Sequence, residues 1–193
     1  MKTTVRMLAA IALLSACAGE PTATDLAADA RAGADGSLRV GAAAEQRALA
    51  TARAATAGFH RFDVAYDAGY TFLFMDMCMV DGSPAAEGGM GYHYVNTQLL
   101  DGTVDPATPE AVLYEPEANG RLRLVAVEYV IPEGAWTSST PPRLFDQDFT
   151  LNQFGLWALH VWLWESNPSG IYKDWNPRVS CDNAGAQTAR AHH

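Results

Sequence analysis

Two histidines and a glutamate stand in apolar surroundings, where a polar side chain needs a partner. His93 lies in the string MGYHYV and His160 in LHVWLW. Glu128 falls in the more apolar row of the strand-like segment 121–131. An isolated buried carboxylate is too costly to leave unpaired, so Glu128 must be protonated, ion-paired or bound to metal. Two imidazoles and one carboxylate are a common ligand set for zinc, copper or iron, and we therefore expect these three residues to be metal ligands.

The same three residues allow two other interpretations. All are isolated in sequence, and no compact signature such as H-x-E or H-E-x-x-H accompanies them. One alternative is a buried His–Glu hydrogen-bond network that only specifies the core. The other is catalysis, through a metal-bound water or with Glu128 as a general base of raised pKa. The sequence leaves open whether the protein is an enzyme, since it contains no G-x-S-x-G, Walker or dinucleotide-binding motif.

A predicted hairpin must position Glu128. The segments 111–115 and 121–131 flank Asn119-Gly120, which is a strong hairpin signal. If Ala118 pairs with Arg121, Ala111 lies opposite Glu128.

The same register decides the role of Glu115. It predicts that Glu115 faces Leu124 and shares a face with Glu128, but about 13 Å away. One small site cannot take both carboxylates unless the hairpin is bulged. We therefore expect Glu115 at the rim of the site or behind its ligands, together with Tyr94 and Trp162.

The other elements follow from hydrophobic periodicity. Segment 45–68 has helical spacing, and Gly69 is a plausible stop for this helix. Strands are expected at 71–77, 92–96 and 156–164, the last buried on both faces or, alternatively, a core helix. The tail from Asn167 is expected to be ordered but irregular, because its Asn-Pro pairs favour extended or turn backbone. The fold class is therefore α+β, with an N-terminal helix packed on a mainly antiparallel sheet or partial barrel.

Cys17 sets the expected location. Lys2 and Arg6 precede the short apolar run 7–14, and the string Leu-Ser-Ala-Cys ends at Cys17. This arrangement is typical of a lipoprotein signal peptide, cleaved before a cysteine that becomes lipidated. An ordinary cleaved signal with a free Cys17 thiol is the alternative. We expect an exported protein anchored to the cell envelope by lipidated Cys17, at the outer membrane if the cell has one.

Composition divides the chain into four expected segments. Residues 1–16 form the expected signal peptide, and 17–46 are rich in small and polar residues and are expected to be a flexible tether. Residues 47–185 fit a single α+β domain, and 186–193 are expected to fray. Removing Lys2 and Arg6 lowers the formal net charge from −9 to −11. Such an acidic chain without a basic run excludes nucleic acid as an expected partner.

The cysteine count supports one disulfide. With Cys17 lipidated, Cys78 and Cys181 remain, and outside the cytoplasm their pairing is the default. Two buried thiols are the alternative. The bond would tie together the segments that carry His93 and His160.

Several ordered strings are similar to those of a family of exported bacterial proteins of unknown function. They are MGYHYV at 90–95, LYEP at 113–116, VEY at 127–129 and LHVWLW at 159–164, followed by NPRVSC at 176–181. The resemblance covers about residues 50 to 181 and implies only that these strings belong to one domain. The leading hypothesis is thus a lipoprotein that binds a transition metal or small ligand, with a metal-dependent enzyme and a structural module as alternatives.

Overall fold

The computed structural model describes residues 23–186, and for residues 23–30, 32–38 and 40 it describes only their helical backbone. The predicted signal peptide, Cys17 and most of the frayed tail lie outside the described residues. The chain divides into a unit that ends at Val40 and a compact unit that begins at Gly41. No helix in the described part is long and apolar enough to cross a membrane.

The first helix is longer than the sequence pattern indicated. Helix α1 spans Ala23–Thr56, so it begins within the segment that was expected to be a tether. The reason is composition: this stretch is rich in alanine, which has the highest helix propensity. Absence of large apolar residues predicts little packing, but it does not exclude a local helix.

The predicted helix over 45–68 is interrupted. After α1, the turn η1 (Ala57–His60) leads to the short helix α2 (Phe62–Asp67). Gly58 falls within η1, and glycine is the weakest helix former after proline. The predicted stop at Gly69 is confirmed, with φ at +100°. Its N–H donates to Tyr66 O and the N–H of Tyr70 donates to Ala65 O, the hydrogen bonds of a Schellman cap.

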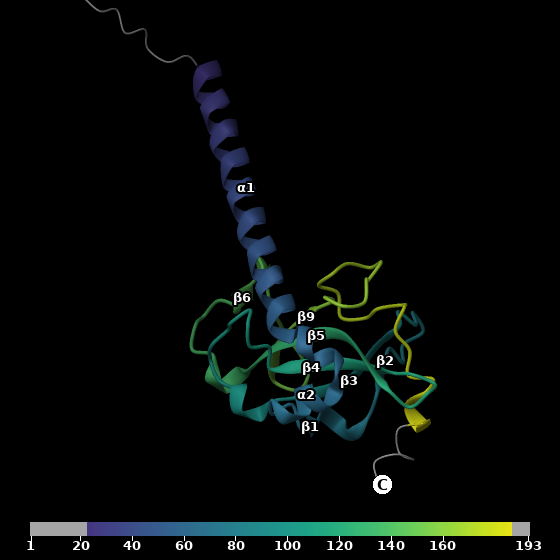
Figure 1. Ribbon diagram of the computed structural model, residues 1–193. Helices are drawn as coiled ribbons and strands as arrows, with labels where there is room; N and C mark the ends of the chain where they lie inside the picture. Colours follow the sequence, from purple (N-terminus) through teal and green to yellow (C-terminus); the bar gives the residue numbers. More distant parts are fainter. Residues whose placement is uncertain (1–22, 187–193) are drawn as a thin grey trace, which may run out of the picture. The chain divides into compact units, whose positions relative to one another are not determined.

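A seven-stranded open sheet forms the centre of the fold, and all of its paired strands are antiparallel (Figure 1). The prediction of an α+β fold is therefore confirmed, as a sheet and not as a barrel. The strand order is β1-β3-β4-β5-β9-β8, and β2 also pairs with β3. The bounds are β1 Phe72–Leu73, β2 Met79–Val80, β3 Gly89–Val95, β4 Ala111–Pro116, β5 Leu122–Pro132, β8 Thr150–Leu151 and β9 Leu156–Val161.

Smaller elements connect these strands. Strands β6 (Arg143–Leu144) and β7 (Gln147–Asp148) form a separate ribbon. The remaining 3-10 turns are η2 (Phe74–Asp76), η3 (Thr97–Leu99), η4 (Glu133–Ala135) and η5 (Ala184–Ala186). The predicted strand over 71–77 is thus mostly a turn, in which Met75 and Asp76 adopt positive φ. The predicted strand over 156–164 is confirmed for its first six residues, which form β9, whereas residues 162–164 are irregular.

The hairpin of β4 and β5 contains a bulge that the sequence did not reveal. Ala111 lies opposite Glu128, as predicted, but Glu115 pairs with Arg123 instead of Leu124. The register shifts between Leu113 and Tyr114. The loop is also one residue longer than a two-residue turn, because the N–H of Glu117 donates to Arg121 O. Gly120, at φ +76°, supplies the left-handed residue that such a three-residue loop requires.

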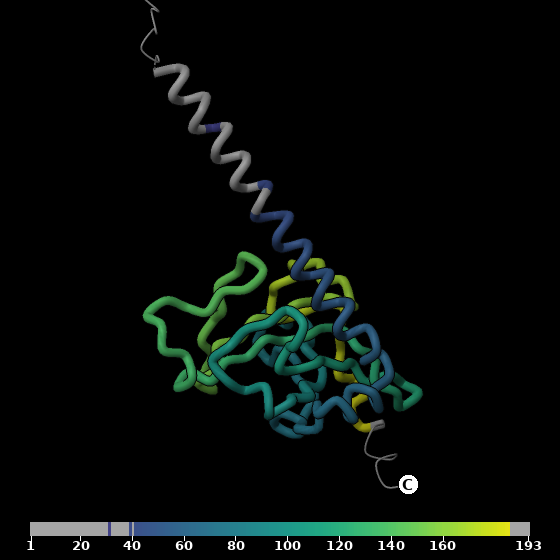
Figure 2. Tube along the Cα trace, turned by 60° about the vertical axis from the view of Figure 1, so that its left-hand side comes forward, coloured from purple at the N-terminus to yellow at the C-terminus, as the bar shows by residue number. Residues whose placement is uncertain are grey.

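The two faces of the sheet have different coverings. One face packs against the end of α1 and against α2, through residues such as Leu49, Ala52 and Ala65. We call it the helix face; from the sheet it includes Val112, Tyr114, Leu124, Val127, Tyr129, Ile131, Leu159 and Val161. The opposite face, called the site face, carries a smaller apolar cluster and is partly covered by the β2 segment and the C-terminal tail. The C-terminal tail is yellow in Figure 2, and it runs back against the start of β3, where Asn176 bridges Gly89.

The predicted disulfide between Cys78 and Cys181 is confirmed, and it joins the β2 segment to the tail. The tail is ordered without regular structure, as predicted, and Asn176 forms a bridge with Gly89 at the start of β3. Gly88 must be glycine there: at φ +121°, a Cβ would lie 2.1 Å from the Asn176 carbonyl oxygen. The tail and β3 therefore approach each other at the start of the strand that carries His93.

Candidate metal centre

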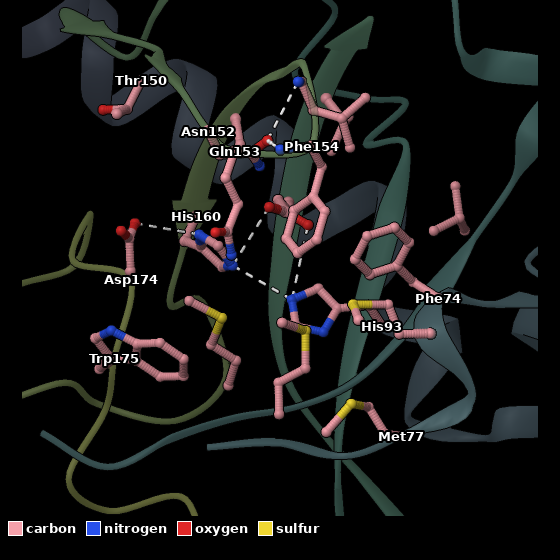
Figure 3. A pocket seen from close by; sticks show the side chains of 18 of the residues that line it. Phe74, Met77, His93, Thr150, Asn152, Gln153, Phe154, His160, Asp174 and Trp175 are labelled. Carbon is pink, nitrogen blue, oxygen red and sulfur yellow. Dashed lines mark hydrogen bonds and ion pairs between the residues drawn. The ribbon is translucent and has the colours of Figure 1, made fainter. Parts of the chain in front are cut away.

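Three neighbouring parts of the sheet bring His93, Glu128 and His160 together on the site face (Figure 3). Glu128 on β5 lies directly opposite His160 on β9. His93 comes from β3, on the other side of β4. Ala111 is the β4 residue opposite Glu128, and its small side chain leaves room for His93 and Glu128 to meet over β4.

The ligand atoms of the three side chains are close. The two Nε2 atoms of His93 and His160 are 3.4 Å apart. Glu128 Oε2 lies 3.7 Å from His93 Nε2, and its Oε1 lies 3.4 Å from His160 Nε2. One nitrogen from each imidazole and one carboxylate oxygen all lie within 4.8 Å of one another. This buried group could hold a metal ion.

Hydrogen bonds do not account fully for the buried imidazoles. The Nδ1 atoms of His93 and His160 have no hydrogen-bond partner. His160 Nδ1 lies 3.4 Å from Asp174 Oδ1, which is ion-pair distance without hydrogen-bond alignment. Unsatisfied buried polar atoms are uncommon and each requires an explanation. Here they show that the group is incompletely matched as a self-contained hydrogen-bond network.

Burial controls the charge of the three groups. It lowers the pKa of His93 to about 3, and the neighbouring His160 acts in the same direction, so His93 is neutral. Burial raises the pKa of Glu128, although the charge of His160 opposes this shift. For His160, burial alone would lower the pKa, but the carboxylates of Glu128 and Asp174 outweigh it and raise the pKa. Metal ligands must be deprotonated, so neutral His93 can bind directly, whereas a metal would have to displace the protons that the raised pKa values of Glu128 and His160 favour.

A pocket of about 780 Å³ opens above the three residues. His93, Glu128 and His160 all line it, together with Asp174 from the tail. Most other lining residues are apolar, and Figure 3 shows Phe74, Met77, Phe154 and Trp175 around the polar group. The group is therefore buried but not sealed, because the pocket gives access to it.

The other predicted residues occupy different positions. Trp162 is buried on the site face, and its indole N–H donates to the carbonyl oxygen of Lys173, the residue before Asp174. It therefore helps to place the Asp174 carboxylate. Glu115 does not line the pocket; it pairs with Arg123 and accepts a 2.9 Å hydrogen bond from the Ser180 N–H. It anchors the tail beside the disulfide.

Tyr94 is not beside the candidate ligands. Its ring contacts Phe62 and Tyr114, and it packs with the core of the helix face. Adjacent residues of a strand point to opposite faces, so Tyr94 faces away when its neighbour His93 faces the site. The same alternation could have excluded Tyr94 from the site on sequence alone.

Two features of the site were absent from the sequence predictions. Asp174 lies in the irregular tail, and no periodic pattern relates it to His160. The methionines offered a clearer signal: Met75, Met77 and Met79 alternate in sequence shortly before His93, and Met90 precedes it by three residues. All four line the pocket.

Comparisons with known proteins do not add a function to this geometry. No family model, no curated protein and no solved structure matches the chain significantly.

Proposed function

We propose that this protein binds a divalent transition metal ion through His93, Glu128 and His160. The supporting observation is the spacing of the ligand atoms. Metal–ligand bonds near 2.05 Å in a tetrahedral site separate neighbouring ligand atoms by about 3.3 Å. The two Nε2 atoms are 3.4 Å apart, and Glu128 approaches them through different oxygens, with Oε1 3.4 Å from His160 and Oε2 3.7 Å from His93, so all three separations are close to this value. They exceed the usual hydrogen-bond range of about 2.7–3.2 Å.

Zinc is the first ion to test, because it accepts two imidazoles and a carboxylate in four-coordinate geometry. Copper and iron(II) accept the same ligand set and are the competing candidates. Cellular location is part of the proposal: we infer an exported protein anchored by lipidated Cys17. The Cys78–Cys181 disulfide supports an oxidising compartment, although only weakly.

A metal-dependent enzyme is the second candidate. One observation favours it: the three candidate ligands line an open pocket, so a fourth coordination position would be reachable from solvent. A metal-bound water at that position would be a nucleophile near neutral pH. A module whose polar cluster only specified the core would not need access to the cluster.

Metal analysis of the untagged protein tests the proposal. The chain would be stripped with a chelator, incubated with zinc, copper or iron(II), dialysed and analysed for bound metal. We expect one equivalent for the wild type and loss of that equivalent in His93→Gln and His160→Gln. His60→Gln is the matched control, because His60 is exposed and its ring contacts Trp164.

The terminal histidines need a separate control. A chain that ends at residue 186 lacks His192 and His193 and should still bind one equivalent. A stoichiometry near zero for all three metals would overturn the proposal. Retention of the metal by both site variants, with loss on truncation, would overturn it equally.

A further inference from the structure

The wall of the pocket contains most of the large apolar side chains that are exposed to solvent in the described part of the chain. Seven large apolar side chains are exposed in the described part of the chain, and five of them line this pocket. These five are 42–51% exposed: Phe72, Met75, Met77, Val80 and Phe154. Concentrated exposure of apolar side chains marks a binding surface, whereas scattered exposure does not.

The five residues come from two segments that face each other. Phe72 to Val80 belong to the β1–β2 segment, and Phe154 belongs to the turn between β8 and β9. The rings of Phe74 and Phe154 make an edge contact, with centroids 5.3 Å apart, that links the two segments. The Cys78–Cys181 disulfide fixes the first segment to the tail. The exposed apolar rim is therefore held in place by covalent and aromatic contacts.

The methionines add a second property. Six methionines occur in the sequence, and all four that follow residue 7 line this pocket. Methionine is flexible and polarizable, and it is common on surfaces that adapt to apolar ligands. The volume of about 780 Å³ lies within the range of pockets that hold small organic molecules.

The titratable groups of this mainly apolar space gather in one place: His93, Glu128 and His160 form the floor, and Asp174 lies beside His160. Thr150, Asn152 and Gln153 line the β8–β9 side, and apolar side chains form the rest of the wall. A divalent ion on two neutral imidazoles and one carboxylate keeps a positive charge and an open position, which an anionic oxygen donor would fill. An apolar molecule without such a head would leave that position to water.

We infer that the pocket binds an amphipathic organic acid, with its carboxylate at the His93–Glu128–His160 floor and its apolar body against the methionine and phenylalanine wall. The inference rests on the proposed metal site for the placement of the head, and on the pocket wall for the body. A ligand of this class fits both a binding protein, as its cargo, and a metal-dependent enzyme, as its substrate.

Fluorescence titration with 11-(dansylamino)undecanoic acid tests the inference. Bound metal is measured first on the same sample, so that failure of the metal site is detected separately. We expect the zinc-loaded wild type to bind the probe at least about tenfold more tightly than the chelator-treated protein. The methyl ester of the probe should lose this metal dependence. No binding to protein that carries one equivalent of zinc would overturn the inference and leave the proposed metal site intact. Equal affinity with and without zinc would overturn the placement of the head.

Variants of the exposed apolar rim test whether the apolar body of the ligand contacts the pocket wall. Phe154→Gln and Met77→Gln should each weaken probe binding by about tenfold, because each removes apolar contact area. Leu151→Gln is the matched control, since Leu151 is 40% exposed on the neighbouring strand but does not line the pocket. Met77→Leu keeps the apolar contact without the sulfur and should bind the probe normally.

Two outcomes point to other occupants and would overturn the inference. If Met77→Leu loses metal while Phe154→Gln binds the probe normally, the thioethers serve as ligands for a soft metal. If sedimentation shows a dimer that Phe154→Gln dissociates, a second copy of the chain covers the rim.

Discussion

The buried polar groups on the two faces of the central sheet differ in whether they have hydrogen-bond partners. On the helix face, the hydroxyls of Tyr70, Tyr114 and Tyr129 each donate to a backbone carbonyl oxygen at 2.7–2.8 Å. On the site face, the Nδ1 atoms of His93 and His160 have no hydrogen-bond partner. A buried group without a partner costs about 1–3 kcal/mol of stability. The contrast indicates that the helix face is optimised for stability, whereas the site face retains groups that suit a ligand.

The contrast extends to what covers each face. Helices cover one face through a continuous apolar core, whereas the site face is partly covered by the β2 segment and the irregular tail. The tail is held by the disulfide and by contacts of single residues, such as the Glu115 hydrogen bond to the Ser180 N–H. Perturbations of these covalent and polar contacts should therefore affect the site face first.

Removing the disulfide should have the largest effect. In Cys78→Ser/Cys181→Ser, the unfolded chain gains the freedom of a loop of 103 residues, and we expect a loss of about 5 kcal/mol in unfolding free energy. Urea denaturation measures this loss. Hydrogen exchange on the folded fraction should show reduced protection first in β2 and the tail, and last in β4 and β5.

Cys17→Ser is the control for this experiment, because it leaves the pair intact. A loss below about 2 kcal/mol, or exchange that rises uniformly on both faces, would contradict the picture of a site face held mainly by this bond.

Glu110 challenges the contrast most directly, because it is a buried carboxyl outside the site. Its Oε2 accepts a hydrogen bond of 2.9 Å from the Val130 N–H, and burial raises its pKa to about 8. The folded protein therefore holds a proton that the unfolded chain releases near pH 4.5. Stability should fall as pH rises from 4.5 through 8, by up to about 1.4 kcal/mol per pH unit.

Glu110→Gln should remove this dependence, because the amide oxygen still accepts from Val130 and cannot ionise. The difference in unfolding free energy between variant and wild type, measured in chelator from pH 5 to 8, should grow in favour of the variant. Glu87→Gln, at an exposed carboxyl, should show no such trend. A pH-independent difference for Glu110→Gln would show that Glu110 is ionised in the folded protein.

The sequence predicted the features that depend on local patterns better than those that depend on contacts between distant parts of the chain. Alternation placed Glu128 in the more apolar row of its strand, and the Asn-Gly signal located the hairpin. Ala111 lies opposite Glu128, as predicted, because the longer loop and the bulge shift the register in opposite directions. The cysteine count gave the disulfide. These inferences succeeded because each rests on a local pattern or on a small set of possible pairs.

The failures involve backbone irregularity and long-range contact. The bulge between Leu113 and Tyr114 moved Glu115 to Arg123, and no residue in that stretch requires a bulge. The positive φ at Met75 and Asp76 turned an expected strand into a rim of the pocket. Asp174 reaches His160 from an irregular tail, so only the folded chain reveals the contact.

Adjacent residues of β5 allow the two faces to be tested as a matched pair. Glu128 points to the site face and Tyr129 to the helix face. Glu128→Gln should weaken zinc binding by at least about 100-fold, because the carboxylate ligand is lost. Its unfolding free energy without metal should change by less than about 1 kcal/mol, because an amide of nearly the same shape fills the same space and His160 can become neutral when the carboxylate is lost.

Tyr129→Phe should do the opposite. It leaves the Pro106 carbonyl oxygen without its 2.8 Å hydrogen bond and should cost about 1–2 kcal/mol of stability, with zinc affinity unchanged. Chemical denaturation gives the unfolding free energy of each variant, and zinc titration gives its zinc affinity. If both variants lost stability alike and neither lost zinc affinity, the two faces would not differ in role.

Asp174→Asn should have the smallest effect, confined to the site face. The carboxylate lies 3.4 Å from His160 Nδ1, and this contact lowers the pKa of Asp174 and raises that of His160. A carboxylate behind a ligating imidazole orients the ring and increases its basicity, and its loss typically weakens metal binding by about 10-fold. Because the Asp174 side chain is 64% exposed, the unfolding free energy should hardly change. Asp148→Asn, at a similarly exposed carboxylate paired with Arg143, should leave zinc affinity unchanged. Equal zinc affinity in Asp174→Asn and wild type would place Asp174 outside the metal centre, and the tail would then cover the site face without tuning its chemistry.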